Sequence, residues 1–280
     1  MPPSATPLSA PRIAFIGGGN MASAILGGLL RAGHPAERLR VVEPVAAQAE
    51  ALRSRFGVEV DAAGGAALRE ADLVVWAVKP QVFADAARPC AAHVGRALQL
   101  SVMAGLRCDA IARATGAERV VRAMPNTPAL IGQGIAGLYA TPAVSADDRA
   151  AVEAVLAPTG EAMWVEAETD LDAVTALSGS GPAYVFYFVE SMMQAATEMG
   201  LSAEQGRRLA LATFKGATAL ARAGDDPPET LRARVTSKGG TTHAAITAMD
   251  AAGVKPAIVR AVRAAQERAR QLGDEFGRPA

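Results

Sequence analysis

The chain has 280 residues, half of them apolar, and its 28 basic side chains match its 28 acidic ones in number. A chain of this length can bury one large core or two modest ones. Its balanced charge provides no overall field that would recruit nucleic acid or an anionic membrane, so any partner must be inferred from a local site.

Cysteine and histidine are sparse. Cys90 and Cys108 are too few for a disulfide framework and lack metal-site spacing, which is typical of a protein from a reducing compartment. The three histidines, His34, His93 and His243, lie far apart and form no recognised metal-binding pattern. We therefore expect no metal site.

The first eleven residues, MPPSATPLSAP, lack both the basic and the apolar region of a signal peptide. We expect a flexible tail over residues 1–11. No uncharged apolar run approaches the roughly 20 residues that span a bilayer. The sequence thus predicts a soluble, cytoplasmic protein.

Residues 12–166 alternate short apolar segments with helical stretches. The apolar segments are rich in Val, Ile and Leu without strict alternation, as in strands of a parallel sheet covered by helices on both faces. This part of the chain is predicted to be an α/β domain. The expected strands lie within residues 12–16, 38–43, 57–60, 71–78, 97–102, 119–124, 134–140 and 162–165.

After Glu166–Asp170 the strand signals stop, and residues 167–280 are predicted to form an all-helical domain. The expected helices are 182–199, 203–222, 228–235, 242–252 and 256–272. The first carries Tyr184, Phe186, Tyr187 and Phe188 and is apolar around most of its circumference. It is either a central core helix or a helix covered by a second subunit.

The segment RIAFIGGGNMASAI joins the first predicted strand to a helix. Gly17, Gly19 and Ala22 match the dinucleotide pattern G-x-G-x-x-A, in which glycine lets the backbone approach a pyrophosphate at a helix N-terminus. A tight turn without a ligand is the alternative. The place of the glycine motif after the first strand of an α/β pattern favours the cofactor interpretation.

Glu43 ends the second predicted strand, where a carboxylate can accept hydrogen bonds from an adenosine ribose and repel a 2'-phosphate. This position favours NAD(H) over NADP(H). Alternatively, Glu43 caps the next segment or faces solvent. Gln48, Arg53 and Arg55 are further candidates for turning toward the ribose.

Three more loops follow predicted strands, at the sheet edge where ligands of α/β proteins bind. WAVKPQ, residues 76–81, carries Lys79, which either contacts the cofactor or is simply solvated. SVMAG spans 101–105, and MPNTP spans 124–128. Prolines stiffen the last loop around Asn126 and Thr127, whose polar groups suit a small polar ligand.

Two glycine-containing segments precede helices in the second half. LSGSGPAYVF, residues 177–186, is explained by ordinary capping with Pro182 near the helix start, and it is not a G-x-S-x-G elbow. VTSKGGTTHAAI, residues 235–246, offers free N–H groups to an anion such as a carboxylate. Its hydroxyls are more than a cap needs: Thr236, Ser237, Thr241 and Thr242.

Together these segments resemble the pyrroline-5-carboxylate reductase family. FIGGGNMASAI, AVKPQ, RAMPNTPALIGQG, ALSGSGPAYVF and VTSKGGTTHAAI occur in that family's order and approximate spacing, and the resemblance runs from Arg12 to about Gln271. It implies reduction of 1-pyrroline-5-carboxylate to L-proline with NADPH or NADH. It also implies a Rossmann-type N-terminal domain with a mostly parallel sheet, and a helical C-terminal domain that forms a dimer, often assembled into decamers.

The resemblance also implies the site residues. Asn126 matches a position near the meeting point of nicotinamide and imine, and Asp225 stands at a family acidic position that departs in length if the family residue is Glu. The implied substrate contacts are Ser237, Gly240, Thr241 and Thr242. The implied cofactor contacts are Ile16, Gly17, Gly18, Gly19, Asn20, Met21, Ala77, Val78, Lys79, Pro80, Val102, Met103 and Ala104.

The proposed chemistry needs no strong base, because the imine can arrive protonated and the protein mainly supplies proximity and electrostatics. We expect the N–H groups of Gly240 and Thr241, with Ser237, to hold the substrate carboxylate. The Thr242 hydroxyl is expected at the imine nitrogen, as the catalytic contact.

Two alternatives remain, a β-hydroxyacid dehydrogenase or other imine reductase, and a non-catalytic dinucleotide sensor. The first uses a helix-borne lysine, but Lys215, Lys238 and Lys255 stand in no matching motif. The intact SKGGTTH segment argues against the sensor.

Overall fold

The computed structural model describes residues 10–276, which pack into two compact units. The first unit comprises the described residues up to Ser180 and those from Ala265 onward, and the second is Gly181–Ala264. These units differ in extent from the domains proposed from the sequence, 12–166 and 167–280, which were defined by the type of secondary structure. Most of the proposed N-terminal tail lies outside the described residues.

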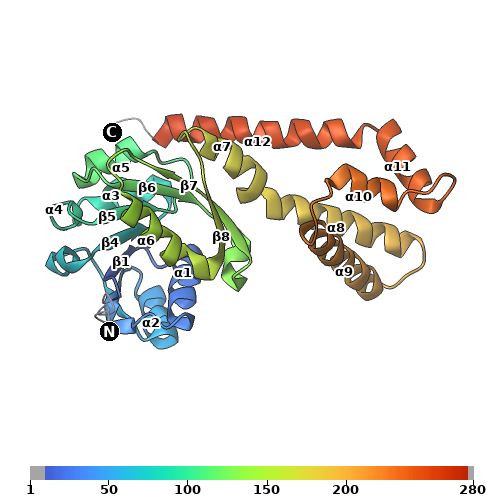
Figure 1. Cartoon of the computed structure of the whole chain (residues 1–280). Helices are drawn as coiled ribbons and strands as arrows, with labels where there is room; N and C mark the ends of the chain where they lie inside the picture. The colour runs from blue at the N-terminus through green and yellow to red at the C-terminus, as the bar shows by residue number, and fades with distance from the viewer. Residues whose placement is uncertain (1–9, 277–280) are drawn as a thin grey trace, which may run out of the picture. The chain divides into compact units, whose positions relative to one another are not determined.

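The first unit is built on a sheet in the order β3-β2-β1-β4-β5-β6-β7-β8 (Figure 1). Every neighbouring pair is parallel except β6 and β7, which are antiparallel, so the prediction of a mostly parallel sheet is confirmed. The strands are β1 (Ile13–Ile16), β2 (Leu39–Val42), β3 (Glu59–Asp61), β4 (Leu73–Trp76), β5 (Leu98–Ser101), β6 (Val120–Met124), β7 (Gly134–Ala140) and β8 (Gly160–Trp164).

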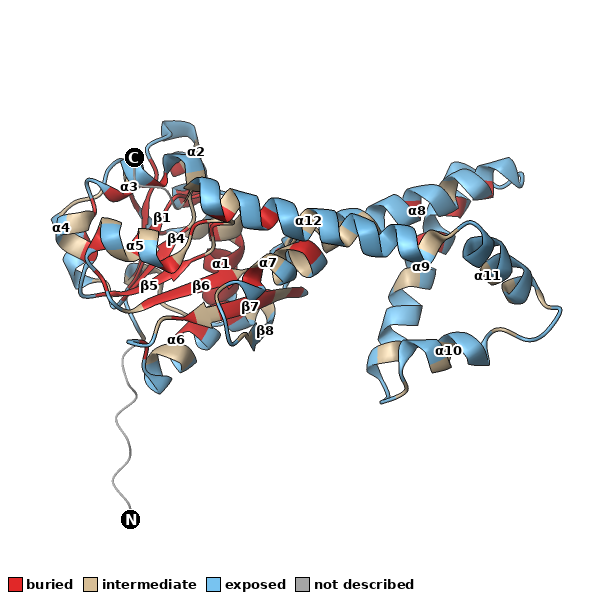
Figure 2. Cartoon of the chain, turned by 90° about the horizontal axis from the view of Figure 1, so that it is seen from above, coloured by how far each residue is buried: buried red, intermediate tan, exposed pale blue. Residues whose placement is uncertain are grey.

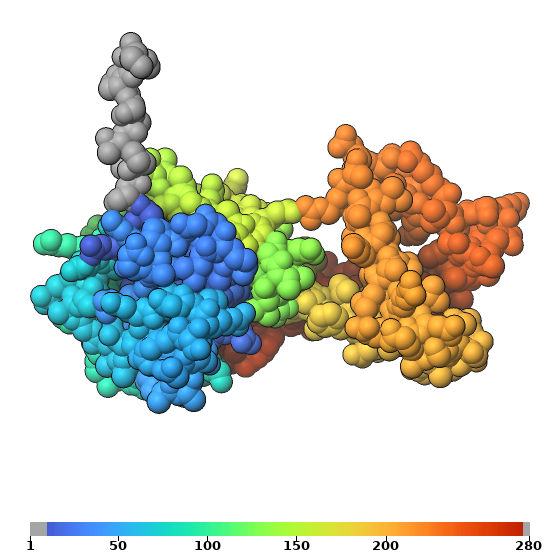
Figure 3. Space-filling view, turned by 90° about the horizontal axis from the view of Figure 1, so that it is seen from below, coloured from blue at the N-terminus to red at the C-terminus, as the bar shows by residue number. Residues whose placement is uncertain are grey.

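Helices cover both faces of the sheet, and the central strands between them are the most buried part of the unit (Figure 2). Side chains alternate between two clusters, with Phe15 in one and Ile16 and Trp76 in the other. This two-sided burial explains the near-continuous apolar runs. The helices are α1 (Asn20–Arg31), α2 (Ala46–Phe56), α3 (Phe83–Ala87), α4 (Ala91–Val94), α5 (Cys108–Thr115), α6 (Ala146–Leu156) and α7 (Asp170–Val174). Residues from the first third of the chain gather on one face of this unit (Figure 3).

The second unit is helical, as predicted. It contains α8 (Gly181–Glu198), α9 (Ala203–Arg222), α10 (Pro228–Arg234), α11 (Thr241–Ala251) and the start of α12 (Val254–Phe276). A capping box at Ser202 and Gln205 begins α9 at the predicted residue. Helices α8 and α9 pack closely, because Gly206 leaves room for Ala196: a Cβ added at residue 206 would lie 2.9 Å from the Ala196 Cβ.

Most apolar side chains of α8 are exposed in the single chain. Phe186 is 59% exposed and Tyr187 is 70% exposed, whereas Val189 is buried. The interpretation of this helix as a core helix of one chain is therefore wrong. The alternative, cover from a second subunit, agrees with the exposure.

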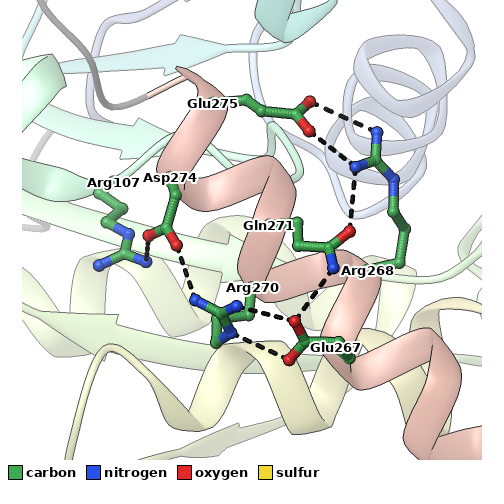
Figure 4. A network of polar contacts seen from close by, with 7 residues as sticks. All are labelled: Arg107, Glu267, Arg268, Arg270, Gln271, Asp274 and Glu275. Atoms are coloured by element: carbon green, nitrogen blue, oxygen red, sulfur yellow. Dashed lines mark hydrogen bonds and ion pairs between the residues drawn. The ribbon is translucent and has the colours of Figure 1, made fainter.

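The last turns of α12 belong to the first unit. Leu272 and Phe276 pack against Gly105, whose φ is +75°, and Arg107 pairs with Asp274 at 2.7 Å. Asp274 also pairs with Arg270, which reaches back to Glu267 (Figure 4). Hydrogen bonds from Arg270 and Gln271 lower the pKa of Glu267 to about 2. This network joins α12 to the start of α5.

Residues 10–276 contain neither a membrane-spanning helix nor a metal-binding cluster. Within that range no helix is both long and apolar enough to cross a membrane. The same residues contain no group of three or more His, Cys, Asp or Glu side chains placed to hold a metal ion.

Candidate functional site

The glycine loop lies between the end of β1 and the start of α1. Gly17 has φ +95°, and a Cβ there would lie 2.8 Å from the Ala77 carbonyl oxygen, so only glycine fits without strain. No side chain caps α1 at Gly19, which leaves the N–H groups of its first turn open to an anion. Ala22 is fully buried, as close packing of this helix requires.

Glu43 holds this loop from the neighbouring strand β2. Its carboxylate is buried and accepts the backbone N–H of Gly18 and that of Val45, each at 2.9 Å. The Gln48 side chain donates to the Gly18 carbonyl oxygen at 2.6 Å. Both backbone polar groups of Gly18 are thus bonded to side chains, and the loop is fixed before any ligand binds.

The two arginines considered for the ribose have other partners. Arg53 donates to the Val60 carbonyl oxygen at 2.7 Å and pairs with Glu50. Arg55 stacks over the ring of Phe56 at 4.9 Å. Neither lines the cavity beside the glycine loop.

That cavity has a volume of about 560 Å³, which is in the range of ligand pockets. Its lining is mostly small and apolar, with Glu43, Asp85 and Lys79 as the charged side chains. Of the predicted cofactor residues it includes Ile16, Gly17, Gly18, Gly19, Glu43, Ala77, Val78 and Lys79.

The other predicted cofactor residues lie outside the lining of this cavity. Asn20 is exposed at the start of α1, and Met21 packs against the core. The β5 loop runs beside β4, since the N–H of Val102 donates to the Trp76 carbonyl oxygen at 3.0 Å. Buried Met103 follows it. The remaining two are Pro80, which begins a short 3₁₀ turn, and half-buried Ala104.

Sequence reasoning missed part of the lining. Ala62, Ala63 and Gly64 follow β3, and Asp85 and Ala86 lie in α3. The segment after β3 had a usable signal, because it leaves the same carboxyl edge of the sheet as the glycine loop. The α3 residues had none, since their place depends on how that helix folds back.

In the loop after β6, the side-chain amide of Asn126 is bonded to other parts of the same chain. Asn126 is half-buried, and its Oδ1 accepts the N–H of Ile135 at 3.0 Å. Its Nδ2 donates to the Ser178 carbonyl oxygen at 3.2 Å. Thr127 is exposed.

A buried charged side chain, Arg122, lies in β6 before this loop, and sequence reasoning did not single it out. Arg122 of β6 pairs with Glu168 at 2.8 Å, and the same carboxylate oxygen accepts the N–H of Cys108 at 2.7 Å. Burial and the nearby Glu168 raise the pKa of the Cys108 thiol. The thiol therefore stays protonated at neutral pH, which argues against a role as nucleophile.

In the second unit, residues 235–240 form a loop that leads into α11. Gly239 has φ +77°, and the N–H of Gly240 donates to the Ser237 carbonyl oxygen at 3.0 Å. No side chain caps α11 at Gly240, so the first N–H groups of the helix are open. Thr241 and Ser237 are exposed and Thr242 is half-buried.

One of the four hydroxyls around this loop is already used. Thr236 donates to the Arg232 carbonyl oxygen at 2.6 Å, which leaves Ser237, Thr241 and Thr242 to face a ligand. Asp225 lies exposed between α9 and α10, and its neighbour Asp226 pairs with Arg234 at the end of α10. The turn that carries Asp225 is thereby tied to the start of the loop.

Comparison with known proteins now identifies the family. Residues 168–272 match the family model described as pyrroline-5-carboxylate reductase dimerisation, and residues 12–105 match that of NADP oxidoreductase, coenzyme F420-dependent. The pyrroline-5-carboxylate reductase of Pseudomonas aeruginosa is 42% identical over 96% of this chain and 100% of its own length. The chain belongs to the pyrroline-5-carboxylate reductase family.

Solved structures of the reductase family agree with this assignment. The enzyme of Coxiella burnetii superposes with a TM-score of 0.88 and 32% identity, over 96% of this chain and 100% of that one. The Plasmodium falciparum enzyme with NADP bound gives a TM-score of 0.85 and 28% identity, over 95% and 99%. The resemblance found in the sequence is confirmed, and the matched dimerisation region, which includes α8, indicates self-association.

Proposed function

We infer that the chain is a pyrroline-5-carboxylate reductase. It transfers hydride from NADPH or NADH to the C=N bond of 1-pyrroline-5-carboxylate and so forms L-proline. One observation carries this inference: a pyrroline-5-carboxylate reductase is 42% identical along its full length. The open helix N-terminus of α11 beside Ser237 supports it, because the substrate is a carboxylate.

The glycine loop fits a dinucleotide. A side chain at Gly17 is excluded, since an added Cβ would lie 2.8 Å from the Ala77 oxygen, and a Cβ at Gly18 would require the Leu52 side chain to move. The open N–H groups of α1 suit a pyrophosphate. We propose that residues 16–21, 77–80 and 102–104 hold the cofactor, with Glu43 at the adenosine ribose. When bound, the dinucleotide supplies the hydride.

The substrate loop supplies binding and a hydrogen bond. We propose that the N–H groups of Gly240 and Thr241, with the Ser237 hydroxyl, hold the substrate carboxylate. The Thr242 hydroxyl then contacts the ring nitrogen, which changes from imine to amine as hydride arrives. Because the imine can enter protonated, this scheme needs no strong base and relies on placement.

The assembly follows from the exposed helices. Self-association through the region of α8 would bury Phe186 and Tyr187, which the single chain leaves open. We propose a dimer as the basic assembly. A decamer and a cytoplasmic location stay predictions from the sequence.

The test is a direct assay. Nicotinamide absorbance is followed with racemic pyrroline-5-carboxylate and each cofactor in turn, and the product is identified as proline. Oxidation of the cofactor with formation of L-proline is the expected result. Cofactor binding without turnover of this imine would contradict the proposal and favour a dinucleotide sensor.

A further inference from the structure

Asn126 joins two segments that lie far apart in the sequence. Its Oδ1 is bonded to the N–H of Ile135 in β7, and its Nδ2 to the carbonyl oxygen of Ser178. Both bonds go to backbone groups of the first unit. The amide is thus held at both ends by the protein itself.

Ser178 lies in a π-helical turn, Thr175–Gly179, between α7 and α8. In an α-helix the carbonyl of residue 178 would accept the N–H of residue 182. Residue 182 is proline, which has no N–H. The Asn126 amide therefore donates to the Ser178 carbonyl, for which Pro182 has no N–H.

Other contacts seat the same turn on the sheet. A Cβ at Gly179 would lie 2.6 Å from the Met124 Cε, and a Cβ at Gly137 would lie 2.7 Å from Val174. These close approaches leave little room for the turn to shift toward the strands. The bond from Asn126 adds a polar contact to this packing.

We propose that Asn126 is a positioning residue, which fixes the turn before α8 by bonding the Ser178 carbonyl, to which Pro182 cannot donate. The inference rests on the proposed function, because the proposed cofactor residues precede this turn and the proposed substrate residues follow it in the chain. Small errors of placement between reacting groups are costly in hydride transfer. Asn126 thus acts on the rate through the backbone, without touching the imine.

The experiment compares wild type, Asn126→Ala, Pro182→Ala and the double variant. Asn126→Ala should lower kcat/KM for the imine by about tenfold or more, mainly through kcat, because the reacting groups are misplaced. The Kd for the cofactor, from nicotinamide fluorescence, should stay within about twofold of wild type, because the glycine loop is untouched. In the Pro182→Ala background residue 182 has its own N–H, so the same substitution should cost less than about threefold.

Equal losses in both backgrounds would overturn the proposal, since a direct contact with the imine or nicotinamide does not depend on Pro182. No loss in either background would overturn it as well. If wild type fails to reduce the imine, the proposed function has failed separately. Coupling between the two substitutions is then measured from the Tm of the four proteins, and additive shifts would reject the role of the bond.

Asn126→Asp gives a second readout. It keeps the acceptor for Ile135 but places a carboxylate against the Ser178 carbonyl. At neutral pH it should lose activity as Asn126→Ala does. As pH falls and the carboxyl gains a proton, its O–H can donate, so activity relative to wild type should rise. A flat ratio across the pH range would contradict the positioning role.

Discussion

The Glu43 carboxylate accepts the N–H of Gly18 at 2.9 Å, so an acid directly after β2 holds the glycine loop that follows the neighbouring strand β1. A negative charge there repels a ribose 2'-phosphate. We predict that NADH competes well with NADPH. The measurement is kcat/KM for each cofactor, and a value for NADPH about a hundredfold above that for NADH would contradict the role of Glu43.

Glu43→Gln sharpens this prediction, because it removes the charge and keeps an acceptor for Gly18. The ratio of kcat/KM for NADPH to that for NADH should rise about tenfold, equivalent to about 1.4 kcal/mol of repulsion. Asp85→Asn is the matched control, since it removes a charge from the lining of the same cavity. An equal change of this ratio in both variants would show that cofactor preference does not depend on the position of Glu43.

Thr242→Ala tests the contact at the imine. We predict that kcat falls about tenfold or more, because the lost hydroxyl is proposed to contact the ring nitrogen in the transition state. Cofactor Kd should hardly change. Thr236→Ala is the control, since that hydroxyl is bonded to the Arg232 carbonyl. Unchanged turnover in Thr242→Ala would remove this residue from the mechanism.

Phe186→Arg tests the uncovered face of α8. This side chain is 59% exposed in the single chain, and a charge there should be left without a partner in a buried subunit contact. Light scattering after size exclusion should show a shift from oligomer to monomer. Ser54→Arg, on the exposed side of α2, should leave the assembly intact. An unchanged mass for Phe186→Arg would place the interface elsewhere.

Cys90 gives a pH-dependent prediction. Burial raises the pKa of its thiol to about 11, above the ordinary thiol value near 9.0. Because the folded pKa is the higher one, the contribution to stability is full below pH 9 and is lost as pH rises toward 11. Denaturant unfolding should therefore show wild type losing more stability than Cys90→Ala over this window. Equal losses would show that the thiol does not titrate as described.

The local signals in the sequence predicted most elements well. Helix α9 begins where expected because Ser202 and Gln205 form a capping box, and apolar runs marked each strand. The antiparallel pairing of β6 with β7 was not visible, since strand direction depends on the path of the connection. The hydrogen bond from Asn126 to Ser178 joins residues 52 positions apart, and no local sequence pattern predicts it.

The site was predicted in the same uneven way. The three glycines and Lys79 line the cavity as expected, because a strand followed by glycine and a helix fixes their place. The exposure of Phe186 could not be decided from a single helix pattern, which looks alike for a core and for a subunit contact. The role of Thr242 stays a prediction.

Helix α12 begins in the second unit and ends in the first, where Leu272 and Phe276 cover Gly105. The helical unit is therefore an insertion, with the first unit resuming at Ala265. A chain cut after Ser180 would lack these last turns and expose apolar surface beside β5. Producing the first unit alone requires a circular permutation or a linker that joins residue 180 to residue 265.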